Sequence, residues 1–128
     1  MLTVFIVDDS PPVAEMLAEL AAGSGAVEVV GVGDSEHAAL DGIRRLRPDV
    51  VVLDLQLHAG SGANVIRAVR SDPALDAVRL LVTSNHAAAQ MRAGCLALGA
   101  DAYFDKVKEL GALTQRLGEL AAEKARGS

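Results

Sequence analysis

The sequence contains a single cysteine and no long apolar run. Cys95 has no partner for an internal disulfide, which agrees with a reducing compartment. The longest uninterrupted apolar runs are Val4 to Val7 and Val50 to Leu53, far short of the roughly 18 residues that a membrane span needs. No basic residue precedes the first run and Asp8 follows it, which argues against a signal peptide. We therefore expect a cytoplasmic protein without membrane insertion.

Basic residues are also scarce. Lys and Arg number 12 against 17 Asp and Glu, which leaves a formal charge of −5. A non-specific nucleic-acid binder needs a basic surface to displace counterions from phosphates, so we expect no nucleic-acid binding. Apolar residues are plentiful at 51%, and 23% of the residues are charged. This composition predicts one domain over residues 1–128, with a core that needs neither disulfides nor a structural metal.

Short apolar runs alternate with longer amphipathic stretches along the chain. The first stretch carries Val13, Leu17, Leu20 and Ala21 at helical spacing, and four further stretches follow. Pro48 and Gly99 separate two of the predicted helices from the next strands. This alternation predicts βα units around a parallel sheet. The expected strands are Leu2 to Val7, Val27 to Val32, Asp49 to Leu53, Arg79 to Thr83 and Ala102 to Phe104.

Polar residues follow the predicted strands at the points where ligands bind in open α/β sheets. Asp8 and Asp9 follow the first strand, Asp54 the third, Ser84 the fourth and Lys106 the fifth. Three neighbouring carboxylates raise one another's pKa unless a cation neutralises them, and an all-oxygen cluster suits Mg²⁺. A lysine beside them pairs with a carboxylate at rest and can neutralise an incoming phosphoryl group.

These residues resemble the receiver domains of two-component response regulators, and in particular their single-domain members of the chemotaxis type. The resemblance covers essentially the whole chain. It implies an α/β fold with a flavodoxin-like, doubly wound, five-stranded parallel sheet of order 2-1-3-4-5 and five helices. The matching motifs, in order, are Val7-Asp8-Asp9-Ser10, Val52-Leu53-Asp54-Leu55, Val82-Thr83-Ser84-Asn85 and Tyr103-Phe104-Asp105-Lys106.

The resemblance also implies a phosphoacceptor and a metal site. Asp54 is expected to take a phosphoryl group from a histidine kinase or a histidine phosphotransfer protein. Mg²⁺ is expected to bind Asp9 directly, Asp8 mainly through water, and Asp54 together with the backbone carbonyl of Gln56. The protein is therefore expected to be a signalling switch that catalyses only its own phosphoryl transfer and dephosphorylation.

Further roles follow from the same resemblance. Lys106 and Ser84 are expected to bind phosphoryl oxygens. Movement of Ser84 is expected to turn Tyr103 inward and to switch the face formed by the last two helices and the fifth strand, which then binds a downstream protein target. Gln56 and His86, two residues after the phosphoacceptor and the switch hydroxyl, are expected to tune the phosphoryl lifetime.

Some local alternatives remain open. Thr83 is a one-residue alternative to Ser84, although the spacings of 30 and 22 residues from Ser84 to Asp54 and Lys106 suit the family better. Asp9 or Ser10 is equally suited to cap the first helix, and Ser84 or Asn85 can cap the helix that follows the fourth strand. Tyr103 can be an ordinary core residue. His37, His58 and His86 share no metal-ligand spacing and are expected on the surface, whereas Cys95 falls on an apolar stripe and is expected to be an inert core residue.

The chain departs from the family pattern at two positions. Many members follow the lysine with a proline in a cis peptide, but here Val107 follows Lys106. A cis bond without proline costs about 2.5 to 4 kcal/mol, so we predict a trans bond. Leu57 stands where many members have proline, so the loop Leu55 to Gly62 is expected to be more mobile than usual.

Three other functional classes compete with the phosphoacceptor. A phosphorylation-independent scaffold with the same fold has no physical need to retain Asp8, Asp9 and Asp54, since these carboxylates repel one another. A small Mg²⁺-dependent phosphatase is disfavoured because Asp8 and Asp9 are adjacent and do not form its DxD start. A nucleotide-binding protein is disfavoured because the glycine clusters have no dinucleotide or phosphate-loop spacing. A complete single-domain regulator and a receiver excised from a longer protein both remain open, and the sequence indicates nothing about dimerisation.

Overall fold

The computed structural model describes residues 1–85 and 89–127. Among these residues the five strands are all parallel, in the order β2-β1-β3-β4-β5. The predicted flavodoxin-like fold is therefore confirmed. In chain order the elements are β1 (Leu2–Val7), α1 (Pro11–Ala22), β2 (Val27–Gly33), α2 (Glu36–Leu46), β3 (Val50–Asp54), α3 (Gly62–Arg70), the 3-10 helix η1 (Pro73–Leu75), β4 (Arg79–Ser84), α4 (Ala89–Leu98), β5 (Ala102–Asp105) and α5 (Leu110–Gly127).

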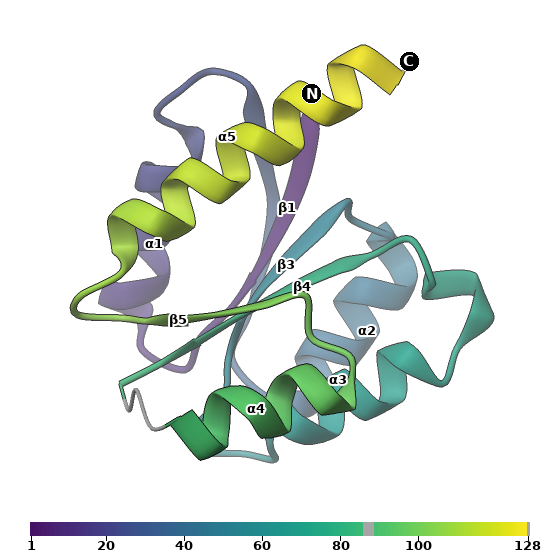
Figure 1. The fold of residues 1–128 in the computed structure, drawn as a ribbon. Helices are drawn as coiled ribbons and strands as arrows, with labels where there is room; N and C mark the ends of the chain where they lie inside the picture. Colours follow the sequence, from purple (N-terminus) through teal and green to yellow (C-terminus); the bar gives the residue numbers. More distant parts are fainter. Residues whose placement is uncertain (86–88, 128) are drawn as a thin grey trace.

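The helices form two layers, one on each face of the sheet. Figure 1 shows α1 and α5 on one face, with α2, α3 and α4 on the other. Because side chains alternate along a strand, Val4 and Ile6 of β1 pack with the α1 and α5 side, while Phe5 and Val7 pack with the opposite layer. Both faces of β1 are thus buried, which explains why it is a continuous apolar run.

β1 ends at Val7 as predicted, whereas β2, β3, β4 and β5 each extend one residue further than predicted. Asp54, Ser84 and Asp105 are the last residues of β3, β4 and β5, and all three take part in the strand register. Their side chains are polar, so the sequence pattern assigned them to the following loops. As members of the ladder they are held in place by backbone pairing on neighbouring strands, which gives the site a rigid base.

Two glycines make room for Phe5 beside the sheet. A Cβ atom at Gly31 would lie 2.9 Å from the Phe5 ring, and a Cβ at Gly42 of α2 would overlap that ring. The register between β1 and β2 shifts between Val4 and Phe5, so β2 carries an irregularity next to this ring. Glycine at these positions is required for packing of α2 against the sheet.

The end of the sheet opposite the candidate site is closed by Asp49. Its Oδ2 accepts hydrogen bonds from the Thr3 amide at 2.8 Å, the Thr3 hydroxyl at 3.0 Å and the Lys124 ammonium at 2.7 Å. Lys124 also donates to the Met1 carbonyl at 2.9 Å. Burial by itself raises the pKa of Asp49, but these hydrogen bonds outweigh it, so its pKa lies below the ordinary value. This cluster fastens α5 to β1.

The structure also tests predictions about one peptide bond, one buried residue and the start of α1. No peptide bond among the described residues is cis, so the predicted trans bond between Lys106 and Val107 is confirmed. The prediction that Leu20 belongs to the buried stripe of α1 is wrong, because it is 41% exposed. Ser10 is the N-cap residue of α1, but its side chain makes no capping hydrogen bond. Arg47 ends α2 with a φ of 44°, a left-handed conformation that the sequence did not reveal.

None of the described helices is long and apolar enough to cross a bilayer.

Candidate functional site

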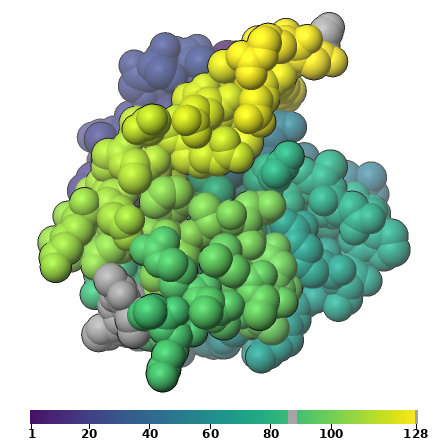
Figure 2. All heavy atoms as spheres, in the orientation of Figure 1, coloured from purple at the N-terminus to yellow at the C-terminus, as the bar shows by residue number. Residues whose placement is uncertain are grey.

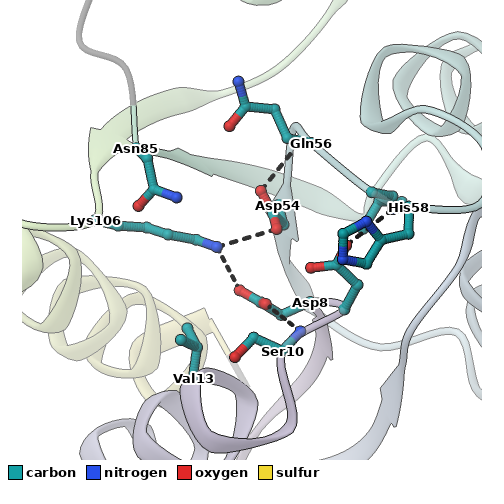
Figure 3. A pocket seen from close by; sticks show the side chains of 10 residues that line it. Asp8, Ser10, Val13, Asp54, Gln56, His58, Asn85 and Lys106 are labelled. Atoms are coloured by element: carbon teal, nitrogen blue, oxygen red, sulfur yellow. Dashed lines mark hydrogen bonds and ion pairs between the residues drawn. The ribbon is translucent and has the colours of Figure 1, made fainter.

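A cavity of about 390 Å³ opens at the carboxyl ends of β1, β3 and β5. Five of the predicted site residues line it, as the close view in Figure 3 shows for most of them. Five further lining residues were not among the predicted site residues. The predicted members are Asp8, Asp9, Asp54, Gln56 and Lys106, and the others are Ser10, Val13, Leu57, His58 and Asn85.

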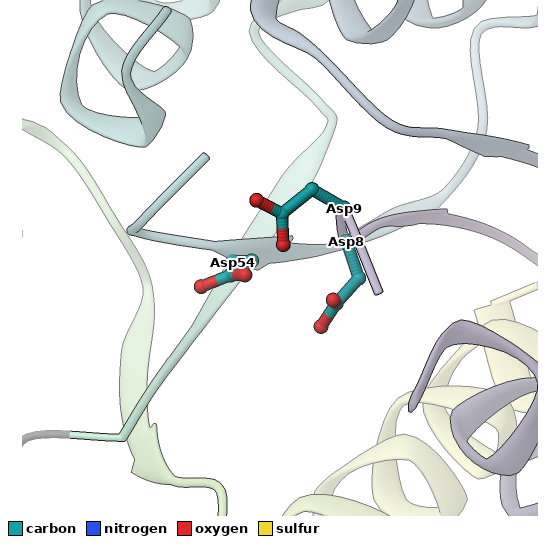
Figure 4. A group of neighbouring side chains, drawn as sticks. All are labelled: Asp8, Asp9 and Asp54. Carbon is teal, nitrogen blue, oxygen red and sulfur yellow. The ribbon is translucent and has the colours of Figure 1, made fainter. Parts of the chain in front are cut away.

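Three carboxylates meet at one side of the cavity. Asp8 and Asp9 follow β1, and Asp54 ends β3 on the neighbouring strand (Figure 4). Each offers one carboxylate oxygen, and these oxygens all lie within 4.8 Å of one another. Asp8 and Asp54 are buried and Asp9 is half-buried. Converging oxygen ligands of high negative charge fit a hard divalent cation such as Mg²⁺, so the residues present suit that ion.

Lys106 reaches between two of these carboxylates. Its Nζ lies 2.6 Å from Asp8 Oδ2 and 3.0 Å from Asp54 Oδ2, and its side chain is only 9% exposed. Burial alone lowers the pKa of Lys106, but the hydrogen bonds to Asp8 and Asp54 outweigh it and raise the pKa. The ammonium is therefore firmly charged at neutral pH.

The pKa of Asp54 is raised despite this lysine. Burial raises its pKa most, and the charge of Asp8 adds to that effect. The amide of Gln56, which donates to Asp54 Oδ1 at 3.0 Å, and the ammonium of Lys106 act in the opposite direction without cancelling it. The ammonium of Lys106 pairs with only two of the three carboxylates, and the remaining negative charge favours the binding of a cation.

Backbone amides orient the other two carboxylates. Ser10 donates its N–H to Asp8 Oδ1 at 2.9 Å, and His58 donates its N–H to Asp9 Oδ2 at 2.9 Å. The imidazole Nε2 of His58 also lies 3.3 Å from the same Asp9 oxygen. The prediction that His58 is a surface residue is confirmed, since its side chain is 92% exposed. Its contact with Asp9 was missed, because it joins loops that are far apart in the sequence.

Ser84 and Tyr103 are buried and are not among the residues that line the cavity. Ser84 ends β4, is fully buried and accepts the N–H of Lys106 on its carbonyl at 2.9 Å. Tyr103 is 2% exposed within the core on the α2, α3 and α4 side, and the guanidinium of Arg92 lies 5.2 Å from its ring centre. The alternative hydroxyl of Thr83 contacts the Leu53 carbonyl at 3.5 Å.

Two remaining predictions concern residues outside this cluster. His86 lies outside the described residues. Cys95 is buried as predicted, and burial raises the pKa of its thiol, which keeps the thiol protonated.

Comparison with known proteins identifies the family. The model of the response regulator receiver domain matches residues 4–118. The chain belongs to the response regulator receiver family. A receiver-domain structure of the putative response regulator NarL from Mycobacterium tuberculosis superposes with a TM-score of 0.85 at 30% identity, and covers 94% of this chain and 96% of that one.

Two proteins that are similar in sequence are longer than this chain. The probable transcriptional regulatory protein TcrX of Mycobacterium tuberculosis is 40% identical over 91% of this chain and 51% of that protein. A protein-glutamate methylesterase/protein-glutamine glutaminase of Nocardioides is 26% identical over 93% of this chain and 32% of that protein. The receiver-family chain thus spans about half and about a third of the lengths of these relatives.

Proposed function

We propose that residues 1–128 act as the phosphoacceptor receiver of a two-component or phosphorelay system. A histidine kinase or a histidine phosphotransfer protein presents the phosphohistidine, and Asp54 accepts the phosphoryl group. The observation that carries this proposal is the buried Asp54 carboxylate at the end of β3, 3.0 Å from the ammonium of Lys106 and grouped with two further carboxylates. Nucleophile, counter-charge and metal-ligating oxygens are in one place.

The residues of the chain divide the chemistry among them. A carboxylate oxygen of Asp54 forms the new O–P bond while the N–P bond of the donor histidine breaks and the imidazole leaves. The amide of Gln56 holds one Asp54 oxygen in place, which limits the rotation of the nucleophile. Lys106 passes from Asp54 to an oxygen of the transferred group and neutralises part of its charge.

The metal ligands of this proposal are Asp8, Asp9, Asp54 and the backbone carbonyl of Gln56, with Asp8 acting mainly through water. Mg²⁺, when bound there, supplies positive charge for the phosphoryl oxygens. Because the carboxylates are already oriented by backbone amides, the chain presents this site without rearranging β1 or β3.

The signal leaves through the face formed by α4, β5 and α5. Figure 2 shows α4 in green and α5 in yellow-green on the same side of the molecule. Ser84, on the strand between Asp54 and β5, donates its hydroxyl to the phosphoryl group, and its movement changes the packing of Tyr103. This cytoplasmic domain exchanges between two packings, and Tyr103 is buried in one of them. The change in their populations controls the binding of a downstream protein.

The same proposal limits what the domain does by itself. It catalyses only its own phosphoryl transfer and dephosphorylation, so it has no separate substrate to turn over. Gln56 lines the cavity beside Asp54 and, together with His86, tunes the lifetime of the phosphoryl group. The domain itself does not bind nucleic acid, in keeping with the formal charge of −5.

The test is intact mass spectrometry after incubation with acetyl phosphate and Mg²⁺. We expect one phosphoryl adduct on the wild type, and none on Asp54→Asn or in the presence of EDTA. Asp41→Asn, which removes an exposed carboxylate on α2, is the matched control and should form the adduct normally. Absence of an adduct on the wild type, together with no binding of beryllofluoride, would reject the proposal in favour of a phosphorylation-independent scaffold.

A further inference from the structure

A tight turn follows β5 and is closed by the side chain of Asp105. This carboxylate is buried, and its Oδ1 accepts the N–H of Val107 at 2.7 Å and the N–H of Lys108 at 2.9 Å. The Asp105 carbonyl accepts the N–H of Glu109 at 2.9 Å, which starts the helical turn before α5. Hydrogen bonds from Lys108 and then from Val107 lower the pKa of Asp105, so it is ionised at neutral pH.

Lys106 sits inside this turn. On one side its own N–H donates to the Ser84 carbonyl at 2.9 Å and continues the ladder between β4 and β5. On the other side the next two amides are held by Asp105. The flexible stem of a lysine does not itself fix where the ammonium lies, so a restrained backbone reduces the number of positions from which the ammonium must find Asp54. Asp105 itself does not line the cavity, so it can act there only through the backbone of Lys106.

A second set of charges fastens the turn to α4. Glu109 Oε1 accepts the N–H of Asp105 at 3.0 Å and the Nη2 of Arg92 at 2.8 Å. Arg92 in turn donates its Nη1 to the Tyr103 carbonyl at 2.6 Å. The start of the turn is therefore bound both to β4 and to α4, so the backbone of Lys106 is restrained from two directions.

We propose that Asp105 is a positioning residue that aims the Lys106 ammonium at Asp54. The inference rests on the proposed function, because it assigns Asp105 a role in the phosphoryl transfer that Lys106 assists. Only the backbone N–H of Val107 belongs to this turn, since a proline at this position would have no N–H to donate to Asp105, whereas the Val107 side chain is exposed. In this chain the carboxylate of Asp105 shapes the turn after the lysine.

The first test measures phosphorylation by acetyl phosphate across a range of concentrations. Asp105→Ala is expected to slow the maximal rate by about tenfold, corresponding to about 1.4 kcal/mol in the barrier, with little change in the half-saturating concentration. Asp105→Asn keeps the Oδ1 acceptor and should stay within about threefold of wild type, since a neutral acceptor gives a weaker hydrogen bond. Val107→Ala retains the N–H and is the matched control, expected at the wild-type rate.

A double-mutant cycle separates positioning from general damage. In a Lys106→Ala background, Asp105→Ala should cause no further loss of rate, because the group on which it acts is gone. An equal loss in both backgrounds would overturn the proposal. So would an Asp105→Ala rate equal to that of wild type.

Lysine labelling provides a readout that does not depend on phosphorylation. The chain has only three lysines, Lys106, Lys108 and Lys124. In EDTA, reductive methylation of folded wild type should be slow at the buried Lys106 and fast at the exposed Lys108. Asp105→Ala should speed labelling of Lys106 and leave Lys124, at the opposite end of the sheet, unchanged.

Equal acceleration at Lys106 and Lys124 would show general loosening of the fold and would contradict the proposal, as would unchanged labelling of Lys106. The two proposals also fail in different ways. If wild type forms no phosphoryl adduct, the proposed function fails, while the labelling still decides whether Asp105 sets the position of Lys106.

Discussion

Gly62 offers a sharp test of how the loop after β3 is packed. It begins α3, and a Cβ atom there would lie 2.6 Å from the Asp54 carbonyl oxygen and 2.7 Å from the Leu55 Cα. Both obstacles are backbone atoms of the segment that carries the phosphoacceptor, so no side chain can rotate away. Gly62→Ala must therefore displace either the start of α3 or the backbone of Asp54.

The expected magnitude follows from this overlap. Overpacking of a rigid site costs about 1 to 3 kcal/mol, and alanine regains at most about 1 kcal/mol through helix propensity. We expect a net loss of about 1 to 2 kcal/mol in the free energy of unfolding. For a domain of this size the melting temperature should fall by about 3 to 10 °C. Gly118→Ala in α5, where a Cβ meets nothing within 4 Å, should instead stabilise by about 0.5 to 1 kcal/mol.

A second glycine separates effects on stability from effects on the site. Gly42→Ala overlaps the Phe5 ring, away from the cavity, and should destabilise by a similar amount. The assays are thermal melting followed by circular dichroism and adduct formation with acetyl phosphate at a temperature where all variants are folded. Only Gly62→Ala should slow adduct formation. If Gly62→Ala melts at the same temperature as the wild type, the reasoning from backbone overlap is refuted. The same holds if Gly42→Ala slows adduct formation as much as Gly62→Ala does.

Three further predictions concern stability. Asp54→Asn should raise the melting temperature at pH 7, because the pKa of Asp54 is raised by burial; the gain should shrink as acid protonates the wild type, and a constant gain would contradict this. Asp49→Ala should lose about 1 to 2 kcal/mol, allowing for partial exposure; because the pKa of Asp49 is lowered by folding, the loss should begin to shrink as the pH falls below the ordinary value of 3.8 and should reach its minimum only below the lowered pKa. Arg47→Gly should stabilise by about 1 kcal/mol in urea unfolding by relieving a φ of 44°, and no gain would argue against strain there.

The sheet was predictable because apolar runs and helical stripes report burial directly. The start of β1, β2, β4 and β5 agrees with the sequence pattern, and β3 begins one residue later at Val50. The end of β1 at Val7 was predicted, but the ends of β3, β4 and β5 were not, since Asp54, Ser84 and Asp105 combine a polar side chain with a paired backbone. Hydropathy follows the side chain, whereas pairing depends on the neighbouring strand.

The candidate site was predictable in its charges but not in its supports. Parallel strand ends share one edge, which brings Asp8, Asp54 and Lys106 together as expected. The amide that His58 gives to Asp9 depends on the path of a loop, and no local pattern encodes it. The turn at Asp105 could have been found from the sequence. An aspartate commonly closes a turn by accepting the backbone N–H two residues later, and Val107, unlike a proline, has that N–H.

The contact between Lys124 and the Met1 carbonyl has a consequence for protein engineering. It holds Met1 beside the last turns of α5, as Figure 1 shows, at the end of the sheet opposite the carboxylates. A short linker between the ends should therefore permit circular permutation, with new termini in an exposed loop. A fluorescent protein fused before Met1 or after α5 would likewise leave the cavity open to a donor protein.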